Sequence, residues 1–172
     1  LANVTFSQEF GVYSDLAVGY THRLLDNDDP TIISNQSHNP FFNLAYRPTV
    51  RFGIVPHVEY LKATYEDNIG DFSNWLGALR LEYKFTRHLE GFFQYAHTAR
   101  DYDSQYGEFE DFHVYDPSVG VGCRLSRAFS LNGWAGYFLQ NNDESKDLGG
   151  YYMGGDLTWE AEHRKITLLA SN

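Results

Sequence analysis

The sequence predicts an all-β fold, an antiparallel up-and-down arrangement of about ten strands in one domain that covers residues 1–172. Apolar and polar residues alternate with period two along most of the chain, whereas helical spacing is hard to find. Short and long connections also alternate strictly. All short turns therefore fall at one end of the predicted sheet and all long loops at the other.

The clearest alternation begins at Trp75 and continues on both sides of the short turn Thr86–His88. Before the turn, one face is expected to carry Trp75, Gly77, Leu79, Leu81, Tyr83 and Phe85, and the other Asn74, Leu76, Ala78, Arg80, Glu82 and Lys84. After it, Leu89, Gly91, Phe93 and Tyr95 oppose Glu90, Phe92, Gln94 and Ala96. Segments 119–125, 129–139 and 151–161 repeat the pattern, and the first seventy residues follow it less regularly.

The connections differ in charge as well as in length. The short turns are predicted near Tyr13–Asp15, Arg47–Pro48, Thr86–His88, Ser126–Ala128 and Glu162–Arg164. The long polar loops are predicted at 26–39, 63–73, 98–113 and 141–150. Eight of the 13 basic residues lie in or beside short turns, and fourteen of the 23 acidic residues lie in long loops, so we expect one basic end and one acidic end.

An antiparallel sheet with one apolar face must bury that face, in a soluble barrel, a sandwich or a membrane barrel. Charges of both signs on the polar face suit either a water-filled lumen or a soluble exterior. Strand length favours the membrane, because about 10–13 residues exceed the usual ~5–6 and match the ~9–11 of a tilted spanning strand. The short-turn and long-loop asymmetry, with aromatic residues near the strand ends, is also typical of outer-membrane barrels. These aromatic residues are Tyr46, Trp75, Tyr83, Phe85, Tyr95, Phe129, Tyr137, Tyr151 and Trp159.

Three stretches share one sequence pattern: an alternating strand, then a short basic turn, then a second alternating strand. They read LRLEYKFTRHLEGFFQYAHTARDYD, GCRLSRAFSLNGWAGYFLQNND and GGDLTWEAEHRKITLLASN. In this pattern the chain resembles bacterial outer-membrane β-barrel porins. The resemblance implies an outer-membrane location and the passage of solutes, or of secreted polysaccharide, through the barrel. The chain ends in Ala170–Asn172 rather than in an aromatic residue. Ten strands either close alone or form part of a larger barrel of about 16–18 strands.

The leading functional hypothesis is a pore without enzymatic activity or cofactor. Its predicted pore-lining residues are the inward charges Arg51, Arg80, Glu82, Lys84, Glu90, Arg124, Asp156 and Glu160. If ten strands close alone, these charges should pair and plug the interior. If the barrel is larger, a water path should remain.

The sequence leaves two alternatives open. A barrel enzyme acting on lipid would use His97 beside Thr98, with Asp103 and Ser104 nearby in sequence. A soluble ligand-binding barrel would point Leu79, Leu81, Phe93 and Leu131 inward around a cavity. The seven histidines lack metal-ligand spacing, and we expect single polar or turn histidines. They are His22, His38, His57, His88, His97, His113 and His163.

The expected partners are membrane lipid and lipopolysaccharide. Divalent cations could be held at the acidic stretches Asp26–Asp29 and Asp101–Asp111. A net charge of −10 argues against nucleic acid. The lone Cys123 excludes an internal disulfide and a CxxC metal site. Because no apolar run approaches ~18 residues, no transmembrane helix is expected. No signal peptide is visible, and a start at Leu1 suggests a mature or trimmed product.

Overall fold

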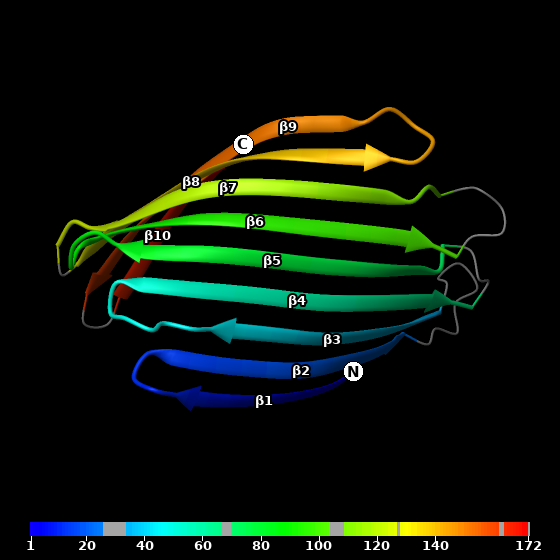
Figure 1. The fold of residues 1–172 in the computed structure, drawn as a ribbon, viewed down its shortest axis with the longest axis horizontal. Coiled ribbons are helices and arrows are strands. Elements are labelled where there is room, and N and C mark those ends of the chain that lie inside the picture. Colours follow the sequence, from blue (N-terminus) through cyan, green and yellow to red (C-terminus); the bar gives the residue numbers. More distant parts are fainter. Residues whose placement is uncertain (26–33, 67–69, 104–108, 127, 162–163, 172) are drawn as a thin grey trace.

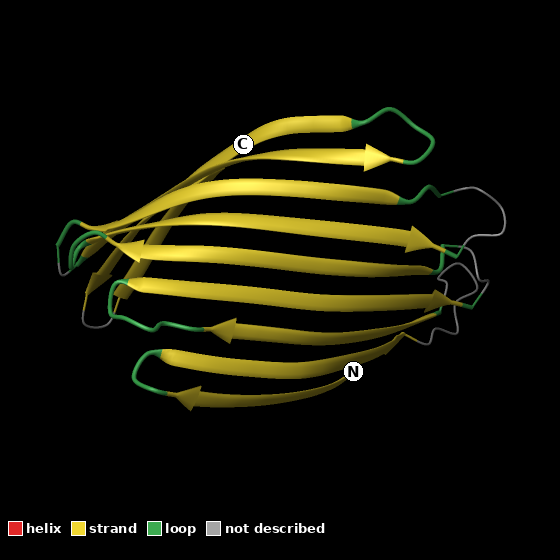
Figure 2. Cartoon of the chain, viewed as in Figure 1, coloured by secondary structure: helices red, strands yellow, loops and turns green. Residues whose placement is uncertain are grey.

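The computed structural model describes residues 1–25, 34–66, 70–103, 109–126, 128–161 and 164–171. The regular elements within these ranges are ten β-strands (Figure 2). They are β1 Ala2–Phe10, β2 Ser14–Leu25, β3 Asn35–Ala45, β4 Phe52–Tyr65, β5 Phe72–Lys84, β6 Leu89–Tyr102, β7 Phe112–Arg124, β8 Phe129–Asn142, β9 Leu148–Ala161 and β10 Arg164–Ser171. The described ranges contain no helix long and apolar enough to cross a membrane.

The strands form one antiparallel sheet whose spatial order is the order of the sequence, from β1 to β10 (Figure 1). This order confirms the predicted up-and-down arrangement. Eight of the strands contain 11 to 14 residues, long enough to span a bilayer when tilted. In the described part of the chain, β1 and β10 are the two edges and do not pair with each other, so the sheet is open.

The strands reach further into the long connections than the sequence pattern predicts. Residues 35–39 were expected in a loop, but they form the first half of β3 and pair with the last residues of β2. His38, for example, is the register partner of His22. The polar residues Asn, Gln and Ser of this segment are typical of loops, yet backbone pairing with β2 keeps them extended.

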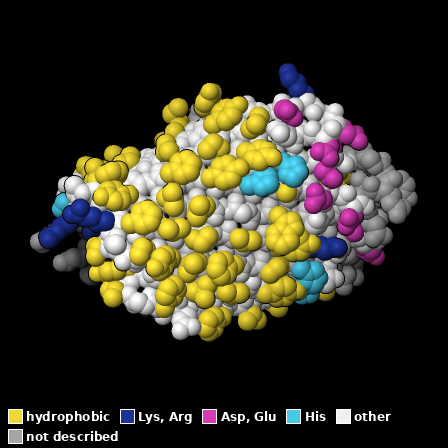
Figure 3. All heavy atoms as spheres, viewed as in Figure 1, with side chains coloured by type: hydrophobic (Ala, Val, Ile, Leu, Met, Phe, Trp, Pro, Cys, Tyr) yellow, Lys and Arg dark blue, Asp and Glu magenta, His cyan; other side chains and the backbone are white. Residues whose placement is uncertain are grey.

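The two faces of the sheet differ in exposure and in chemistry. Large apolar side chains on alternate positions are exposed, among them Trp75 at 52%. Figure 3 shows such side chains spread over one face, with basic groups at one end and acidic groups at the other. Leu79, Leu81, Phe93 and Leu131 all lie on this exposed apolar face. The expectation that they surround an internal cavity is therefore wrong, because the side chains on the less exposed face are the polar ones.

On the inner face, aromatic rings cover glycines of the neighbouring strand. The register pairs are Phe92 over Gly120, Tyr152 over Gly136, Trp134 over Gly154 and Phe138 over Gly150. A Cβ at Gly120 would lie 2.2 Å from the Phe92 ring and 2.9 Å from the Gly133 carbonyl oxygen. The glycines therefore leave room for rings that lie flat against the wall of the sheet.

The short turns are closed by a repeated hydroxyl contact. The Oγ1 atom of Thr86 accepts hydrogen bonds from the backbone N–H groups of His88 and Leu89, at 3.1 and 3.0 Å. Thr49 and Ser126 make the same pair of contacts two and three residues ahead of themselves. A Ser or Thr at the start of the turn thus replaces missing sheet hydrogen bonds, which explains why Thr86–His88 is a corner.

Aspartates close the ends of the long loops in a similar way. The Asp71 carboxylate accepts from the N–H of Tyr65 at 2.6 Å, and the Asp111 carboxylate accepts from the N–H of Tyr102 at 2.7 Å. Asp147 does the same for Asn142 at 3.3 Å. Each aspartate lies just before the returning strand and satisfies the last donor of the outgoing one, so these acidic residues have a structural use.

Candidate functional site

Charged side chains gather on the inner face near the short-turn end of β5 and β6. Arg80, Glu82 and Lys84 occupy alternate positions of β5, and Lys84 is the register partner of Glu90 on β6. The period-two alternation that exposes Leu81 and Tyr83 on one face places these charges on the other.

An ion-pair network fixes the centre of this group. The Arg47 guanidinium, from the connection between β3 and β4, places Nη2 3.1 Å from Oε2 of Glu82 and Nη1 3.8 Å from Oδ1 of Asp15. Arg80 Nε lies 3.2 Å from the other Glu82 oxygen, and its guanidinium carbon sits 3.7 Å from the centre of the Phe92 ring. Glu82 is therefore held between two arginines, one of which rests on an aromatic face.

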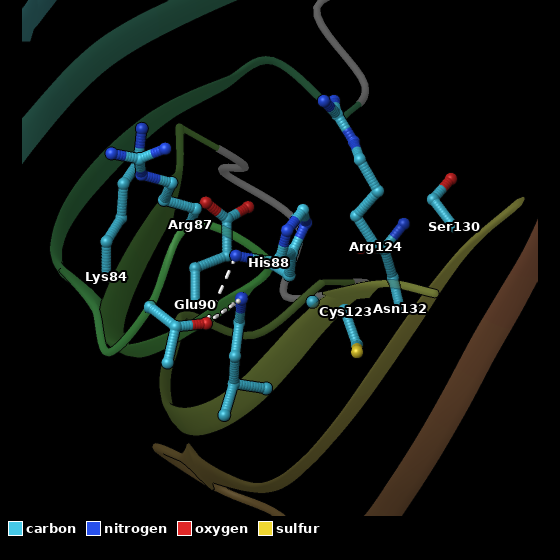
Figure 4. Close-up of a pocket in the computed structure, with 11 residues that line it drawn as sticks. Lys84, Arg87, His88, Glu90, Cys123, Arg124, Ser130 and Asn132 are labelled. Atoms are coloured by element: carbon cyan, nitrogen blue, oxygen red, sulfur yellow. Dashed lines mark hydrogen bonds between the residues drawn. The ribbon is translucent and has the colours of Figure 1, made fainter. Parts of the chain in front are cut away.

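Two hollows open on this wall. One, of about 550 Å³, is lined by Arg47, Arg80, Glu82, Phe92 and Trp134 among others. The second, of about 360 Å³, lies at the short turns and is lined by Lys84, Arg87, His88, Glu90 and Arg124 (Figure 4). Lys84 and Glu90 border both hollows, so the two form a continuous polar surface.

Further polar contacts continue across the inner face of β7, β8 and β9. Asn132 donates from Nδ2 to both carboxylate oxygens of Asp156, at 3.1 and 3.0 Å. The Tyr152 hydroxyl donates to Asp116 at 2.5 Å. Toward the long loops, the Arg100 guanidinium donates to Asn74 at 3.2 Å. The polar groups thus follow the inner face from one end of the strands to the other.

The structure brings five of the eight predicted pore-lining residues together and leaves three apart. Arg80, Glu82, Lys84 and Glu90 line the larger hollow, and Arg124 joins Lys84 and Glu90 in the smaller one. Arg51 is exposed in the connection before β4, and Glu160 is exposed near the end of β9. Asp156 lies on the inner face against Asn132.

Sequence reasoning missed three participants in this site, namely Arg47, Phe92 and Trp134. Arg47 was assigned only to a basic turn, because nothing in the sequence shows that its side chain reaches β5. Phe92 and Trp134 interrupt a polar face, and their glycine partners on the neighbouring strands were the available signal.

The histidines are less isolated than the sequence suggests. His97 Nε2 lies 3.3 Å from His113 Nδ1, and the His97 ring stacks on Tyr115. His22 and His38 also stack, with ring centroids 4.9 Å apart. The expectation of single histidines is wrong for these two pairs. Within the described ranges no group of three or more His, Cys, Asp or Glu side chains could hold a metal ion.

Two expectations fall partly on residues that the structure does not describe. Ser104, the nucleophile of the enzyme alternative, lies outside the described residues, as do His163 and Asp26–Asp29. In the second acidic stretch, Glu110 accepts from the N–H groups of Glu144 and Ser145, at 3.0 and 2.7 Å. That carboxylate joins two long loops.

Comparison with known proteins defines the class of fold. No protein-family model and no curated protein matches the chain. In structure it is similar to OmpT with loop L8 deleted, an outer membrane protein of Vibrio cholerae, with a TM-score of 0.67, 10% identity and coverage of 99% of this chain and 57% of that one. It is also similar to the NanC porin, with a TM-score of 0.53, 11% identity and coverage of 91% and 79%.

The fold is thus that of bacterial outer-membrane β-barrels, and one of these two neighbours is a porin. The chain spans 57% of the length of the OmpT variant.

Proposed function

We propose that the chain forms part of the wall of a non-enzymatic outer-membrane pore for polar solutes. The observation that carries this proposal is that one face of the sheet is apolar and exposed, whereas the inner face bears charges and two hollows lined in part by charged side chains. In a bilayer barrel the apolar side faces lipid and the polar side faces water. By the general pattern of these barrels, the short turns are periplasmic and the long loops extracellular.

A larger barrel with a water path accounts for the inner face better than a plugged ten-strand barrel. The ion pairs of Arg47, Arg80 and Glu82 run along one wall, between β5 and the connection before β4, rather than across an interior. Charges that pair along the wall leave the space in front of it to water. The open sheet and the greater length of the OmpT variant support the same view.

The charges on the wall favour anionic solutes near the periplasmic end. Lys84, Arg87 and Arg124 line the smaller hollow together with Glu90. Rings of charged side chains set the selectivity of pores through electrostatics. In this proposal Arg80, Lys84 and Arg124 attract anions, whereas Glu82 is neutralised by its arginine partners. Arg51, Asp156 and Glu160 act at the margins of the path.

Aromatic rings beside the charges make a sugar polymer the second class of cargo. Phe92 and Trp134 line the larger hollow next to Arg80. Flat apolar rings with adjacent hydrogen-bonding groups suit the faces of sugar rings, so export of a polysaccharide would use the same wall. An oligosaccharide that enters should then interrupt ion current in a way that depends on Trp134.

The test is conductance, in planar lipid bilayers, of the whole barrel protein to which this wall belongs. We expect stepwise current that reports an open water path. Folded protein that inserts into bilayers and carries no current would contradict the pore. A current that oligosaccharides do not block, in wild type or in Trp134→Ala, would remove the polymer alternative and leave the solute pore.

A further inference from the structure

A polar cluster interrupts the apolar outer face close to the long-loop end of β2 and β3. The side chains of Tyr20 and His22 on β2 lie on the same face as the exposed Val18 and Leu24. His38 on β3 is the register partner of His22. Figure 3 shows histidines where the apolar face meets the acidic end. Polar groups on the lipid side of a barrel are tolerated near the membrane interface and not at its centre.

A nearby aromatic pair indicates the depth of this cluster relative to the membrane interface. Tyr60 on β4 and Trp75 on β5 are register partners with ring centroids 4.6 Å apart on the outer face. Rings of this kind form the interfacial girdle of outer-membrane barrels. Lys62 lies two residues beyond Tyr60 toward the long loops and is the register partner of His38. The cross-strand neighbours His22, His38 and Lys62 form a row at one height along the strands. This row therefore lies on the headgroup side of the aromatic girdle.

Hydrogen bonds within the cluster determine where its protons lie. Gln36 Nε2 lies 3.1 Å from His22 Nε2 and 2.9 Å from His38 Nε2. The amide nitrogen can only donate, so both Nε2 atoms accept. A neutral imidazole that accepts at Nε2 carries its hydrogen at Nδ1. His38 therefore donates from Nδ1 to the Tyr20 hydroxyl oxygen, 2.5 Å away.

The cluster therefore presents hydrogen-bond donors at the surface of the outer face. The Tyr20 hydroxyl hydrogen and the His22 Nδ1 hydrogen have no acceptor among the described residues, and the exposed residue Lys62 lies next to His38 on the neighbouring strand. A ligand that only accepts hydrogen bonds and carries negative charge fits this arrangement. Phosphate has that chemistry, and its bonds to ammonium and N–H groups are the strong, charge-assisted kind.

We propose that Tyr20, His22 and Lys62, with Gln36 and His38 as positioning residues, bind a phosphate group of an outer-leaflet glycolipid of the lipopolysaccharide type. The acidic residue in the same row, Asp101, lies two strands beyond Lys62 on β6. We therefore place the phosphate at the part of the row on β2, β3 and β4, away from the Asp101 carboxylate. This inference rests on the proposed outer-membrane location and not on conduction through the barrel.

The test is native mass spectrometry of the full chain, purified in detergent with added lipopolysaccharide. The probe is a bis-phosphorylated lipopolysaccharide of defined composition, compared with the same glycolipid after removal of its phosphates. We expect wild type to retain the phosphorylated form and to lose the dephosphorylated one. Lys62→Gln and His22→Phe should each weaken retention roughly tenfold, as expected for one charge-assisted hydrogen bond.

Lys146→Gln is the matched control, because Lys146 is an exposed lysine in the loop between β8 and β9, at the same end of the barrel. It removes the same charge and should leave retention unchanged. Equal retention by Lys62→Gln and wild type, or equal retention of the two glycolipids, would overturn the site. Failure of the protein to reach the outer membrane would instead contradict the proposed location, so the two failures are distinguishable.

Discussion

Arg47 reaches Glu82 across Gly53, with 3.1 Å between Nη2 and Oε2. The three residues come from the β3–β4 connection, β5 and β4, and Gly53 is the register partner of Glu82. A Cβ at Gly53 would lie 3.1 Å from the Glu82 carboxylate and 3.2 Å from Cγ of Arg47. The absence of a side chain on β4 therefore lets an arginine from one connection pair with a glutamate two strands away.

This pair should be energetically coupled. In a double-mutant cycle with Arg47→Gln and Glu82→Gln, we expect a coupling free energy of unfolding of about 0.5–1 kcal/mol, since both side chains are about 30% exposed to water. The measurement is urea unfolding of the full chain in lipid vesicles. Glu82→Gln combined with Arg124→Gln is the control. Additive losses in the Arg47 cycle would show that the contact is not formed.

The glycines beneath inner-face rings should resist substitution. Gly120→Ala places a Cβ against Phe92 and a backbone carbonyl, and we expect a loss of about 1–3 kcal/mol in the free energy of unfolding. Gly77→Ala is the matched control, because a Cβ there meets nothing within 4 Å. Similar unfolding curves for the two variants would contradict the packing of Phe92 on Gly120.

The short turn at Thr86 should depend on its hydroxyl group. Thr86→Ala removes the acceptor for the N–H groups of His88 and Leu89, and we expect a loss of about 1 kcal/mol. Thr86→Ser keeps the acceptor and should stay close to wild type in the same unfolding assay. A serine variant as unstable as the alanine variant would point to the lost methyl group instead.

Ion selectivity should follow the basic wall. A unit charge about 8 Å from a passing ion contributes about 0.5 kcal/mol in water, attractive for an anion and repulsive for a cation. The two differ by about 1 kcal/mol, so Lys84→Gln should lower the anion-to-cation permeability ratio roughly five- to sixfold. Arg124→Gln should act in the same direction. Reversal potentials in a salt gradient measure the ratio. Lys146→Gln serves as the control for net charge. An effect of Lys146→Gln equal to that of Lys84→Gln would contradict the proposal that the basic residues of the inner face set the selectivity.

Alternation and turn chemistry made much of the fold predictable. From Trp75 onward, period-two spacing placed Leu81 and Tyr83 on one face and Glu82 and Lys84 on the other, because a strand leaves only those two directions. The strand order followed from connection length.

The sequence pattern could not predict contacts between side chains on different strands, because those contacts depend on the register of the strands. Arg47 meets Glu82 only once β4 is placed between them, and His22 meets His38 only if residues 35–39 are extended. The polar composition of that segment argued for a loop. Ring-over-glycine pairs such as Phe92 and Gly120 likewise require knowledge of which positions face each other.

The most direct test of the central claim is thiol labelling along β5 in a Cys123→Ser background, with the full chain in lipid bilayers. Single cysteines are placed in turn at positions 79 to 84 and treated with a membrane-impermeant maleimide. A polar, water-filled inner face predicts labelling at Arg80→Cys, Glu82→Cys and Lys84→Cys and protection at Leu79→Cys, Leu81→Cys and Tyr83→Cys. Labelling of the second set with protection of the first, or equal labelling of both, would contradict a wet inner face.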